Sequence, residues 1–321
     1  MQHLRRVIDQ LRGSRVLVIG DVMLDEYLKG NVSRISPEAP VPILEVKSHE
    51  YTLGGAANAA ANIKALGGAA TLVGVQGDDE NAKILGQRLH DHGIADEVVT
   101  DPTRPTSTKT RFVAQGQQIM RVDRENTARV DGALAAALRV RIDTAVAAAQ
   151  AVVLSDYNKG VVTPDIAQHA IRAARTAGVP VIVDPKKPSF ACYAGATVIT
   201  PNLHELEVAA PRHDSFDIEH AATSLLAHID GSAILVTQSA DGMTLFRTGD
   251  KPFHVPALAK EVYDVTGAGD TVVATVALAL AAGASIEAAI ELASLAAAIS
   301  VSKRGTSTVT ATELAAALAR A

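Results

Sequence analysis

The chain has 321 residues, of which 48% are hydrophobic, with a formal charge of −5 and a pI near 6.1. That length and hydrophobic content allow a large buried core in one or two domains. The acidic balance argues against a nucleic-acid or membrane-surface binder. A single cysteine, Cys192, excludes a disulfide framework. The longest apolar stretch, 271–282, is too short to span a bilayer. We therefore expect a cytoplasmic protein without nucleic-acid or membrane partners.

An amphipathic pattern predicts a helix over 1–13, and a hydrophobic run over 15–21 then predicts a buried strand. Ligands of parallel sheets gather beyond the carboxyl ends of their strands. This places Asp21 and Asp25 near a possible site. Asp21 is equally well explained as a turn or helix cap, so both interpretations stay open.

Two polar segments differ from the rest of the chain. In 27–48, three prolines exclude a long helix and alternation at 42–47 indicates a strand. The segment 106–123 predicts two strands joined by a turn at Gly116. Paired together, these segments would form a small sheet outside the main domain. Its exposed apolar positions would need to be covered by substrate or by a second copy of the chain.

A glycine pair, Gly54 and Gly55, precedes an alanine-rich helix that ends near Gly67. Glycine lets the backbone come close to a ligand, and the amide of Asn58, one turn into the helix, suits sugar hydroxyls. Tight packing of a helix entry on a sheet explains the same glycines.

The remaining chain alternates between strands and helices. Strands are predicted at 70–75, 151–155, 179–184, 197–200 and 233–237, and helices at 78–92, 132–149, 164–177, 203–210, 216–227, 268–282, 286–302 and 310–320. This rhythm is typical of an α/β fold with a doubly wound, mostly parallel sheet flanked by helices. No composition break indicates a second full domain, so we expect one domain over 1–321, with a lid from insertions at about 26–50 and 106–124.

Polar motifs follow several of the predicted strands, which favours a functional site over a set of unrelated turns. They begin at Ser155, Asp184, Thr200 and Gln238. Lysines in or near these motifs suit charge neutralisation, although any single lysine is better explained as a solvated surface charge. His204 has no second His or Cys at metal-ligand spacing, and more simply faces solvent or caps its helix.

The stretch from Asp264 to Thr271 leads a glycine turn directly into a hydrophobic helix. Free N–H groups in the first turn of a helix form an anion site. Asp270 falls inside that site, where a carboxylate suits a base that deprotonates an attacking hydroxyl. An ordinary helix start with Asp in its first turn is the alternative. The chain lacks a G-x-x-x-x-G-K-[ST] loop, a G-x-G-x-x-G fingerprint and a G-x-S-x-G elbow, which disfavours P-loop enzymes, dinucleotide-binding dehydrogenases and serine hydrolases.

Over nearly its whole length the sequence resembles the PfkB (ribokinase-like) carbohydrate kinases. Gly54, Gly55 and Asn58 are similar to the first signature of that family, and the stretch from Asp264 to Thr271 is similar to its second. Asn202 and Glu205 match an N-x-x-E element associated with Mg²⁺ and nucleotide phosphates. The resemblance implies ATP and Mg²⁺ as cofactors, with Glu205 holding Mg²⁺ through water, and a β-sheet lid that forms a homodimer in several branches.

The resemblance also implies roles for individual residues. It makes Asp270 the catalytic base and assigns the anion hole to Gly267, Ala268 and Gly269. We expect ATP to be bound by Lys186, Asn202, Leu203, His204, Glu205, Ser239, Gly242 and Thr266. We expect the sugar site to comprise Asp21, Asp25, Gly54, Gly55, Asn58, Arg34, Lys109, Arg111, Asp123 and Lys159.

A narrower resemblance rests on the run from Gly20 to Asp25 and the run from Ser33 to Pro42. Both are similar to the branch that phosphorylates D-glycero-β-D-manno-heptose 7-phosphate at its anomeric hydroxyl, in ADP-heptose and lipopolysaccharide synthesis. A sugar that already bears a phosphate needs cations at its far end, for which Arg34, Lys109, Arg111 and Lys159 are candidates. Gln238 is a departure from the family pattern, because a basic residue is expected at this position before Ser239. Another kinase of the family and a non-catalytic sugar or nucleotide binder are the alternatives.

Overall fold

The computed structural model describes residues 2–211, 216–259, 262–303, 305 and 307–320. The predicted N-terminal helix is α1 (Gln2–Gln10), and its expected first residue, Met1, lies outside the described residues. None of the helices in the described part of the chain combines the length and apolar character needed to cross a bilayer.

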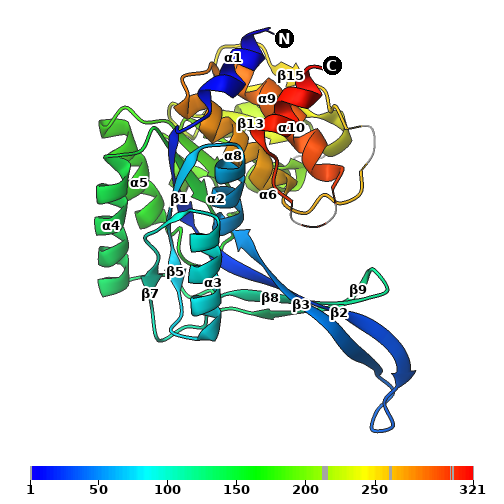
Figure 1. Cartoon of the computed structure of the whole chain (residues 1–321). Helices are drawn as coiled ribbons and strands as arrows, with labels where there is room; N and C mark the ends of the chain where they lie inside the picture. The colour runs from blue at the N-terminus through cyan, green and yellow to red at the C-terminus, as the bar shows by residue number, and fades with distance from the viewer. Residues whose placement is uncertain (1, 212–215, 260–261, 304, 306, 321) are drawn as a thin grey trace.

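A large twisted sheet forms the centre of the molecule (Figure 1). Its strands, in spatial order, are β15 (Phe253–Val255), β14 (Met243–Phe246), β13 (Ala233–Thr237), β12 (Val198–Ile199), β11 (Val181–Asp184), β10 (Ala151–Ser155), β1 (Arg15–Gly20), β4 (Ala69–Val73) and β6 (Ala95–Asp96). Pairing is parallel from β13 to β6 and antiparallel at β13–β14 and β14–β15. The predicted doubly wound, mostly parallel sheet is therefore confirmed, with two short antiparallel edge strands that the sequence pattern did not indicate.

Helices cover both faces of this sheet (Figure 1). One face packs against α1, α2 (Ala56–Ala65), α3 (Glu80–Asp91), α8 (Ala268–Ala281), α9 (Ile286–Val301) and α10 (Ala311–Leu318). The other packs against α4 (Gly132–Val146), α5 (Pro164–Thr176), α6 (Leu203–Ala209) and α7 (Ile218–Leu226). Since the inner strands are buried on both faces, they consist of continuous apolar runs, as is usual in parallel sheets.

Cap chemistry sets where several helices begin. The Asp79 side chain accepts the N–H of Ala82 to begin α3, and Thr163 accepts the N–H of Ile166 to begin α5. A side-chain oxygen at the N-cap satisfies one of the free N–H groups of the first turn. These starts place the loops between strand ends and helices along one edge of the sheet.

The predicted strand 70–75 is interrupted at Gly74, where β4 ends and β5 (Val75–Gln76) begins a separate pair with β7 (Val99–Thr100). A Cβ at Gly74 would lie 2.8 Å from the carbonyl oxygen of Gly20. The backbone thus passes too close to Gly20 for any larger residue, which explains why glycine occupies this position.

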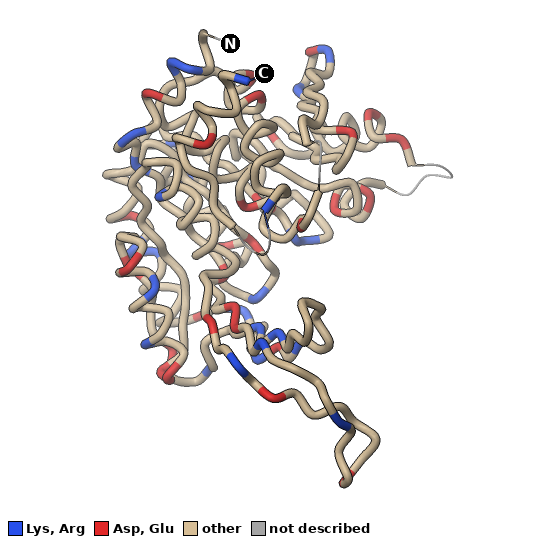
Figure 2. The backbone as a smooth tube through the Cα atoms, turned by 45° about the vertical axis from the view of Figure 1, so that its right-hand side comes forward, with Lys and Arg blue, Asp and Glu red and all other residues tan. Residues whose placement is uncertain are grey.

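The two polar segments pair as predicted into a second sheet that projects from the main body (Figure 1). Its order is β3 (Pro42–Gly55), β2 (Val22–Ile35), β8 (Thr108–Ala114) and β9 (Gln117–Arg124). The strand predicted at 42–47 extends to Gly55 as β3, and β2, which the sequence pattern did not indicate as a strand, pairs with it through polar residues with two register shifts. Basic and acidic residues both gather where this sheet leaves the main body (Figure 2).

Candidate active site

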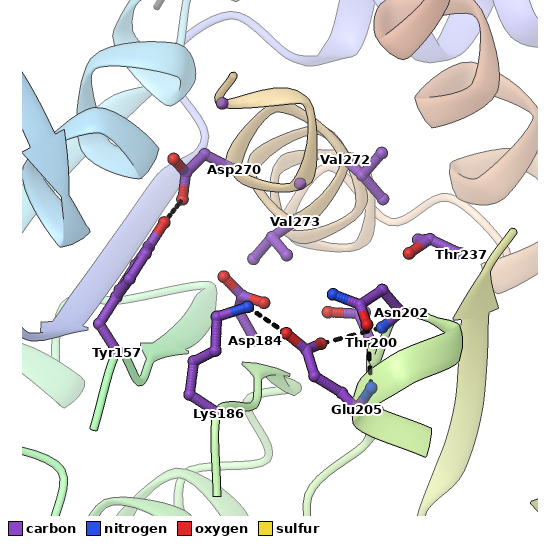
Figure 3. Close-up of a pocket in the computed structure, with 12 residues that line it drawn as sticks. Tyr157, Asp184, Lys186, Thr200, Asn202, Glu205, Thr237, Asp270, Val272 and Val273 are labelled. Atoms are coloured by element: carbon purple, nitrogen blue, oxygen red, sulfur yellow. Dashed lines mark hydrogen bonds and ion pairs between the residues drawn. The ribbon is translucent and has the colours of Figure 1, made fainter. Parts of the chain in front are cut away.

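A cavity of about 210 Å³ lies beyond the carboxyl ends of the central strands, against the first turn of α8. It is lined by Tyr157, Asp184, Lys186, Thr200, Asn202, Glu205, Thr237, Gly267, Gly269, Asp270, Val272 and Val273. Figure 3 shows how these side chains converge from strand-end loops and from α8. The expected convergence of polar motifs after successive strands is thus present in the structure.

The helix α8 begins at a glycine turn that only glycine adopts easily. Gly267, its N-cap residue, has φ 79°, in the left-handed region. A Cβ on Gly269 would meet nothing within 4 Å, so there is open space in front of this turn. The N–H of Ala268 already donates to the carbonyl oxygen of Val265 at 3.2 Å. The N–H groups of Gly269 and Asp270, in the same first turn, are the ones left for an anion.

Asp270 lies in this first turn and is only 5% exposed. Asn58 Nδ2 donates to Asp270 Oδ2 at 2.7 Å, and the Tyr157 hydroxyl donates to Asp270 Oδ1 at 2.8 Å. Burial raises the pKa of Asp270 to about 6, while the hydrogen bonds from Asn58 and Tyr157 oppose that rise. A carboxylate of this basicity is well matched to accept a proton near neutral pH.

Asp184 ends β11 and faces the same cavity (Figure 3). Burial, followed by the charge of Asp270, raises the pKa of Asp184 well above its ordinary value. The positive charge of Lys186 acts in the opposite direction. Two carboxyl groups in one small cavity favour the binding of a cation, which would stabilise both in their ionised form.

Asn202 and Glu205 begin α6 with a capping box. Asn202 Oδ1 accepts the N–H of Glu205 at 2.9 Å, and Glu205 Oε2 accepts the N–H of Asn202 at 2.9 Å. The other oxygen of Glu205 accepts a hydrogen bond from Lys186 Nζ. The N-x-x-E motif therefore caps the start of α6. The same contacts keep Glu205, and Lys186 bonded to it, at the cavity wall.

The glycine pair ends β3, where it pairs with Val22 and Met23 at the start of β2. Gly55 has φ 56°, and a Cβ there would lie 2.4 Å from the carbonyl oxygen of Asp21. A Cβ on Gly54 would lie 3.0 Å from Asp25 Oδ2. Asp25 in turn accepts Arg111 Nη1 at 2.6 Å. Gly54, Asp25 and Arg111 thus meet at the base of the second sheet.

Both oxygens of Asp21 are occupied by the main chain. They accept the N–H groups of Tyr157, Lys159 and Val161 at 2.8, 3.0 and 3.1 Å. Burial raises the pKa of Asp21, and the three backbone hydrogen bonds only partly offset this. The contacts of Asp21 are therefore those of a turn cap, because its carboxylate binds the main chain of the loop after β10.

Three candidate cations already have carboxylate partners. Lys109 Nζ lies 2.9 Å from Asp123 Oδ2 and 3.6 Å from Glu125 Oε2. Lys159 Nζ lies 2.5 Å from Glu125 Oε1. Arg111 pairs with Asp25. Glu125 is not among the predicted site residues. Its two partners, Lys109 and Lys159, lie far apart in sequence, so no local pattern indicates this contact.

Arg34 stands apart from these groups. It is an exposed residue near the tip of β2, nine residues beyond Asp25 on the same strand. At roughly 3.3 Å per residue the separation along the strand is about 30 Å. Within a single chain, Arg34 and Asp25 therefore do not face one ligand.

The remaining predicted ATP residues lie outside the cavity lining. Leu203 packs partly buried on the core, while His204, Ser239 and Thr266 are exposed. Gly242 is buried with φ 93°, and a Cβ there would lie 2.1 Å from the carbonyl oxygen of Val255. Backbone crowding thus explains Gly242 without a ligand.

Tyr157 and Asp184 line the cavity but were not predicted as site residues. Both belong to polar motifs at strand ends, so the signal was present in the sequence. The position of a motif after a strand indicates a site, but it does not single out these two side chains within their motifs. Thr200, Thr237, Val272 and Val273 complete the lining without a sequence signal of their own.

A buried carboxylate at a glycine-bounded helix start, with a lysine and a second acid across a small cavity, is an arrangement suited to phosphoryl transfer. Residues 14–313 match the pfkB family carbohydrate kinase profile, and the chain belongs to this family of sugar kinases. The resemblance inferred from the two glycine motifs is thereby confirmed.

Curated relatives cover most of this chain. It is 49% identical over 306 residues to the bifunctional protein HldE of Caulobacter vibrioides, which covers 94% of this chain and 63% of that protein. It is 45% identical over 313 residues to the bifunctional protein HldE of Vibrio parahaemolyticus, covering 97% of this chain and 65% of that protein. The chain thus spans about two thirds or slightly less of the length of these relatives.

Solved structures share the fold. The ribokinase of Arabidopsis thaliana complexed with ribose and ATP aligns with a TM-score of 0.74 at 23% identity, covering 95% of this chain and 99% of that one. Phosphofructokinase-2 of Escherichia coli in complex with potassium aligns with a TM-score of 0.77 at 20% identity, covering 96% and 99%. The ribokinase-like fold implied by the resemblance to the PfkB family is confirmed.

Proposed function

We propose that this chain transfers the γ-phosphoryl group of ATP to the anomeric C1 hydroxyl of D-glycero-β-D-manno-heptose 7-phosphate, giving the 1,7-bisphosphate. The product would serve ADP-heptose synthesis for the lipopolysaccharide inner core. The observation that carries the kinase part is Asp270, buried at the N-terminus of α8 and open to the cavity. Similarity to proteins named HldE, together with the runs at 20–25 and 33–42, supports the choice of sugar.

The proposed step uses residues already in place. Asp270 accepts the proton of the attacking hydroxyl, whose oxygen forms a bond to the γ-phosphorus as the bond to the bridging oxygen of ADP breaks. The N–H groups of Gly269 and Asp270 stabilise the negative charge of the transferred phosphoryl group. Lys186, at the opposite wall, adds a positive charge where the phosphates of ATP would lie.

Asp184 and Glu205 are the residues that would hold Mg²⁺. Among the described residues no group of three or more His, Cys, Asp or Glu side chains could hold a metal ion on its own. Mg²⁺ in kinases keeps several waters and shares phosphate oxygens, which fits a site with few protein ligands. The raised pKa of Asp184 also fits, because an ionised carboxyl group at that position requires a nearby cation. Bound there, the ion would neutralise the phosphate charge.

The far end of the sugar would lie at the base of the second sheet. Lys109, Arg111 and Lys159 are grouped there, each paired with an acidic residue. A phosphate at this position would exchange some of these carboxylate contacts for its own. Asn58 and Asp25 would then lie between this phosphate and Asp270, within reach of sugar hydroxyls.

We further propose that the second sheet is a lid and the contact surface of a homodimer. Three large apolar side chains on β9, Ile119, Met120 and Val122, are 45–52% exposed. An edge strand that exposes several large apolar side chains is normally covered in solution. A dilute monomer with full activity in sedimentation experiments would contradict the dimer.

The substrate proposal is tested by measuring ADP release over a panel of acceptors. The panel contains D-glycero-D-manno-heptose 7-phosphate, the heptose without phosphate, fructose 6-phosphate, ribose and a nucleoside. We expect the highest kcat/KM with the heptose 7-phosphate. Equal or better activity on an unphosphorylated sugar would exclude it, and ligand binding with no transfer to any acceptor would indicate a non-catalytic binder.

A further inference from the structure

Tyr157 contacts the base of the proposed reaction directly. It follows β10, and its hydroxyl points at Asp270 Oδ1 across 2.8 Å (Figure 3). Asn58 donates to the other oxygen of the same carboxylate. A carboxylate oxygen can accept two hydrogen bonds, so one lone pair on each oxygen remains for a ligand in the cavity.

We propose that Tyr157 is a positioning residue that holds the Asp270 carboxylate in one orientation and in its proton-accepting form. Donors on both oxygens fix the rotation of the carboxylate and leave a free lone pair directed toward the cavity. This inference rests on the proposed role of Asp270 as base. It adds a residue that acts through Asp270 and whose loss can be measured without any substrate.

The loop that carries Tyr157 is held by hydrogen bonds from its main chain to Asp21. Asp21 accepts the N–H of Tyr157 and of two further loop residues. Gly160, in the same loop, has φ 94°, and a Cβ there would lie 2.2 Å from the carbonyl oxygen of Ala128. Since the backbone is anchored on both sides, the phenol is held in place against Asp270.

The residue before Tyr157 provides a comparison. Asp156 is fully buried and pairs with Lys187. It accepts a hydrogen bond from the Tyr193 hydroxyl at 2.5 Å. Neither Asp156 nor Tyr193 lines the cavity. Tyr193 is therefore a fully buried phenol that donates to a buried carboxylate away from Asp270, whereas Tyr157 is partly buried.

Charged groups reach Asp270 from several elements. Asp25 on β2 and Asp184 at the end of β11 have the same charge and disfavour its ionisation, while Lys186 favours it. Burial is the largest influence and raises the pKa of Asp270, and the hydrogen bonds from Asn58 and Tyr157 lower it. Burial and the nearby carboxylates raise the pKa of Tyr157 well above its ordinary value, so the phenol keeps its proton and remains a donor.

The test compares Tyr157→Phe with the matched control Tyr193→Phe, both in the full chain. Carbon-13 NMR of labelled aspartate, assigned with Asp270→Asn, gives the pKa of Asp270 without ligands. We expect Tyr157→Phe to raise that pKa by about one unit, the size of one hydrogen bond to a charged group. With MgATP and D-glycero-D-manno-heptose 7-phosphate, the acid limb of kcat should move by the same amount. The plateau of kcat should fall about tenfold, through lost orientation.

The Tyr193→Phe control should leave both the pKa of Asp270 and the acid limb unchanged. An unchanged pKa and a plateau within twofold of wild type in Tyr157→Phe would overturn the inference. Turnover that survives Asp270→Asn would instead overturn the proposed function, so the two failures are distinguishable. If Tyr157→Phe does not fold, 3-fluorotyrosine at position 157 retains the ring and strengthens the donor. It should then lower the pKa of Asp270, and no change would count against the inference.

Discussion

Asn58 and Asp270 are 212 residues apart in sequence, and the Asn58 amide donates to the Asp270 carboxylate across 2.7 Å. The contact joins the first turn of α2 to the first turn of α8, and so connects the two glycine motifs. The sequence suggested that Asn58 binds sugar hydroxyls. The structure adds that Asn58 donates to Asp270, the proposed base, which places the expected sugar side and the expected phosphoryl side of the site within one hydrogen bond of each other.

Replacing Asp270 by Asn should remove the proton acceptor and keep the fold. We expect kcat to fall by a factor of about 10³ to 10⁴, as when a general base is lost. KM for ATP should change little, because the N–H groups of the α8 turn are main-chain atoms. Coupled ADP release at saturating substrates measures the change, with circular dichroism as the folding control. Turnover within tenfold of wild type would remove Asp270 from the role of base.

Asp270 should also make stability depend on pH. Its pKa is about 6 in the folded chain against 3.8 for an ordinary aspartate, because it is buried. Below about pH 4 both states are protonated, and above pH 6 both are ionised. Between these values the unfolded chain has lost the proton that the folded chain retains, so stability falls as pH rises through this window.

The expected size of this effect is about 3 kcal/mol, from a shift of about two pKa units. It is read as the difference in the free energy of unfolding between wild type and Asp270→Asn, from urea titrations at pH 4 and pH 7. Between pH 4 and pH 7, the free energy of unfolding of the wild type should fall by about 3 kcal/mol more than that of the variant. A difference that does not change with pH would show that the carboxyl group titrates normally.

Asp184 should control the requirement for Mg²⁺. We expect Asp184→Asn to raise the Mg²⁺ concentration for half-maximal activity by about tenfold or more, as for other residues that support a metal. Asp165→Asn is a suitable control, since Asp165 is exposed in the first turn of α5 and pairs with Arg139 on α4. Equal Mg²⁺ dependence in the two variants would argue against a metal role for Asp184.

Lys109 should act on the phosphorylated end of the sugar. Lys109→Met removes one cation, while Asp123 keeps its contacts with Arg121 at 2.8 and 3.1 Å. We expect KM for heptose 7-phosphate to rise about tenfold, the size of one charge-assisted hydrogen bond, with KM for ATP unchanged. Lys83→Met, at an exposed pair with Glu80 on α3, is the control. If KM for the unphosphorylated heptose rises by the same factor, Lys109 does not bind the sugar phosphate.

Much of the fold was readable from local pattern. The inner strands, such as β10 and β11, are short apolar runs between polar motifs, so their burial follows from composition alone. By contrast, β2 contains Asp25, Glu26 and Lys29, whose partners on β3 and β8 are distant in sequence. Its full length depends on those pairings and could not be read from the segment itself.

The site divides in the same way. The glycine turn before Asp270 could be predicted because glycine readily adopts the left-handed backbone conformation that a sharp turn needs. The contacts of Asp21 with the loop after β10, and of Lys159 with Glu125, could not be predicted, since both depend on tertiary placement. Arg34 shows the converse, because a motif that resembles a substrate signature lies near the exposed tip of β2.

The position of the transferred phosphate tests the central claim most directly. The full chain is incubated with MgATP and D-glycero-β-D-manno-heptose 7-phosphate, and the product is examined by phosphorus-31 NMR with proton coupling. We predict a second sugar phosphate resonance, coupled to the anomeric proton, that grows in step with ADP and is absent with Asp270→Asn. A phosphate on any other hydroxyl, or no sugar bisphosphate while another acceptor is phosphorylated, would contradict the account.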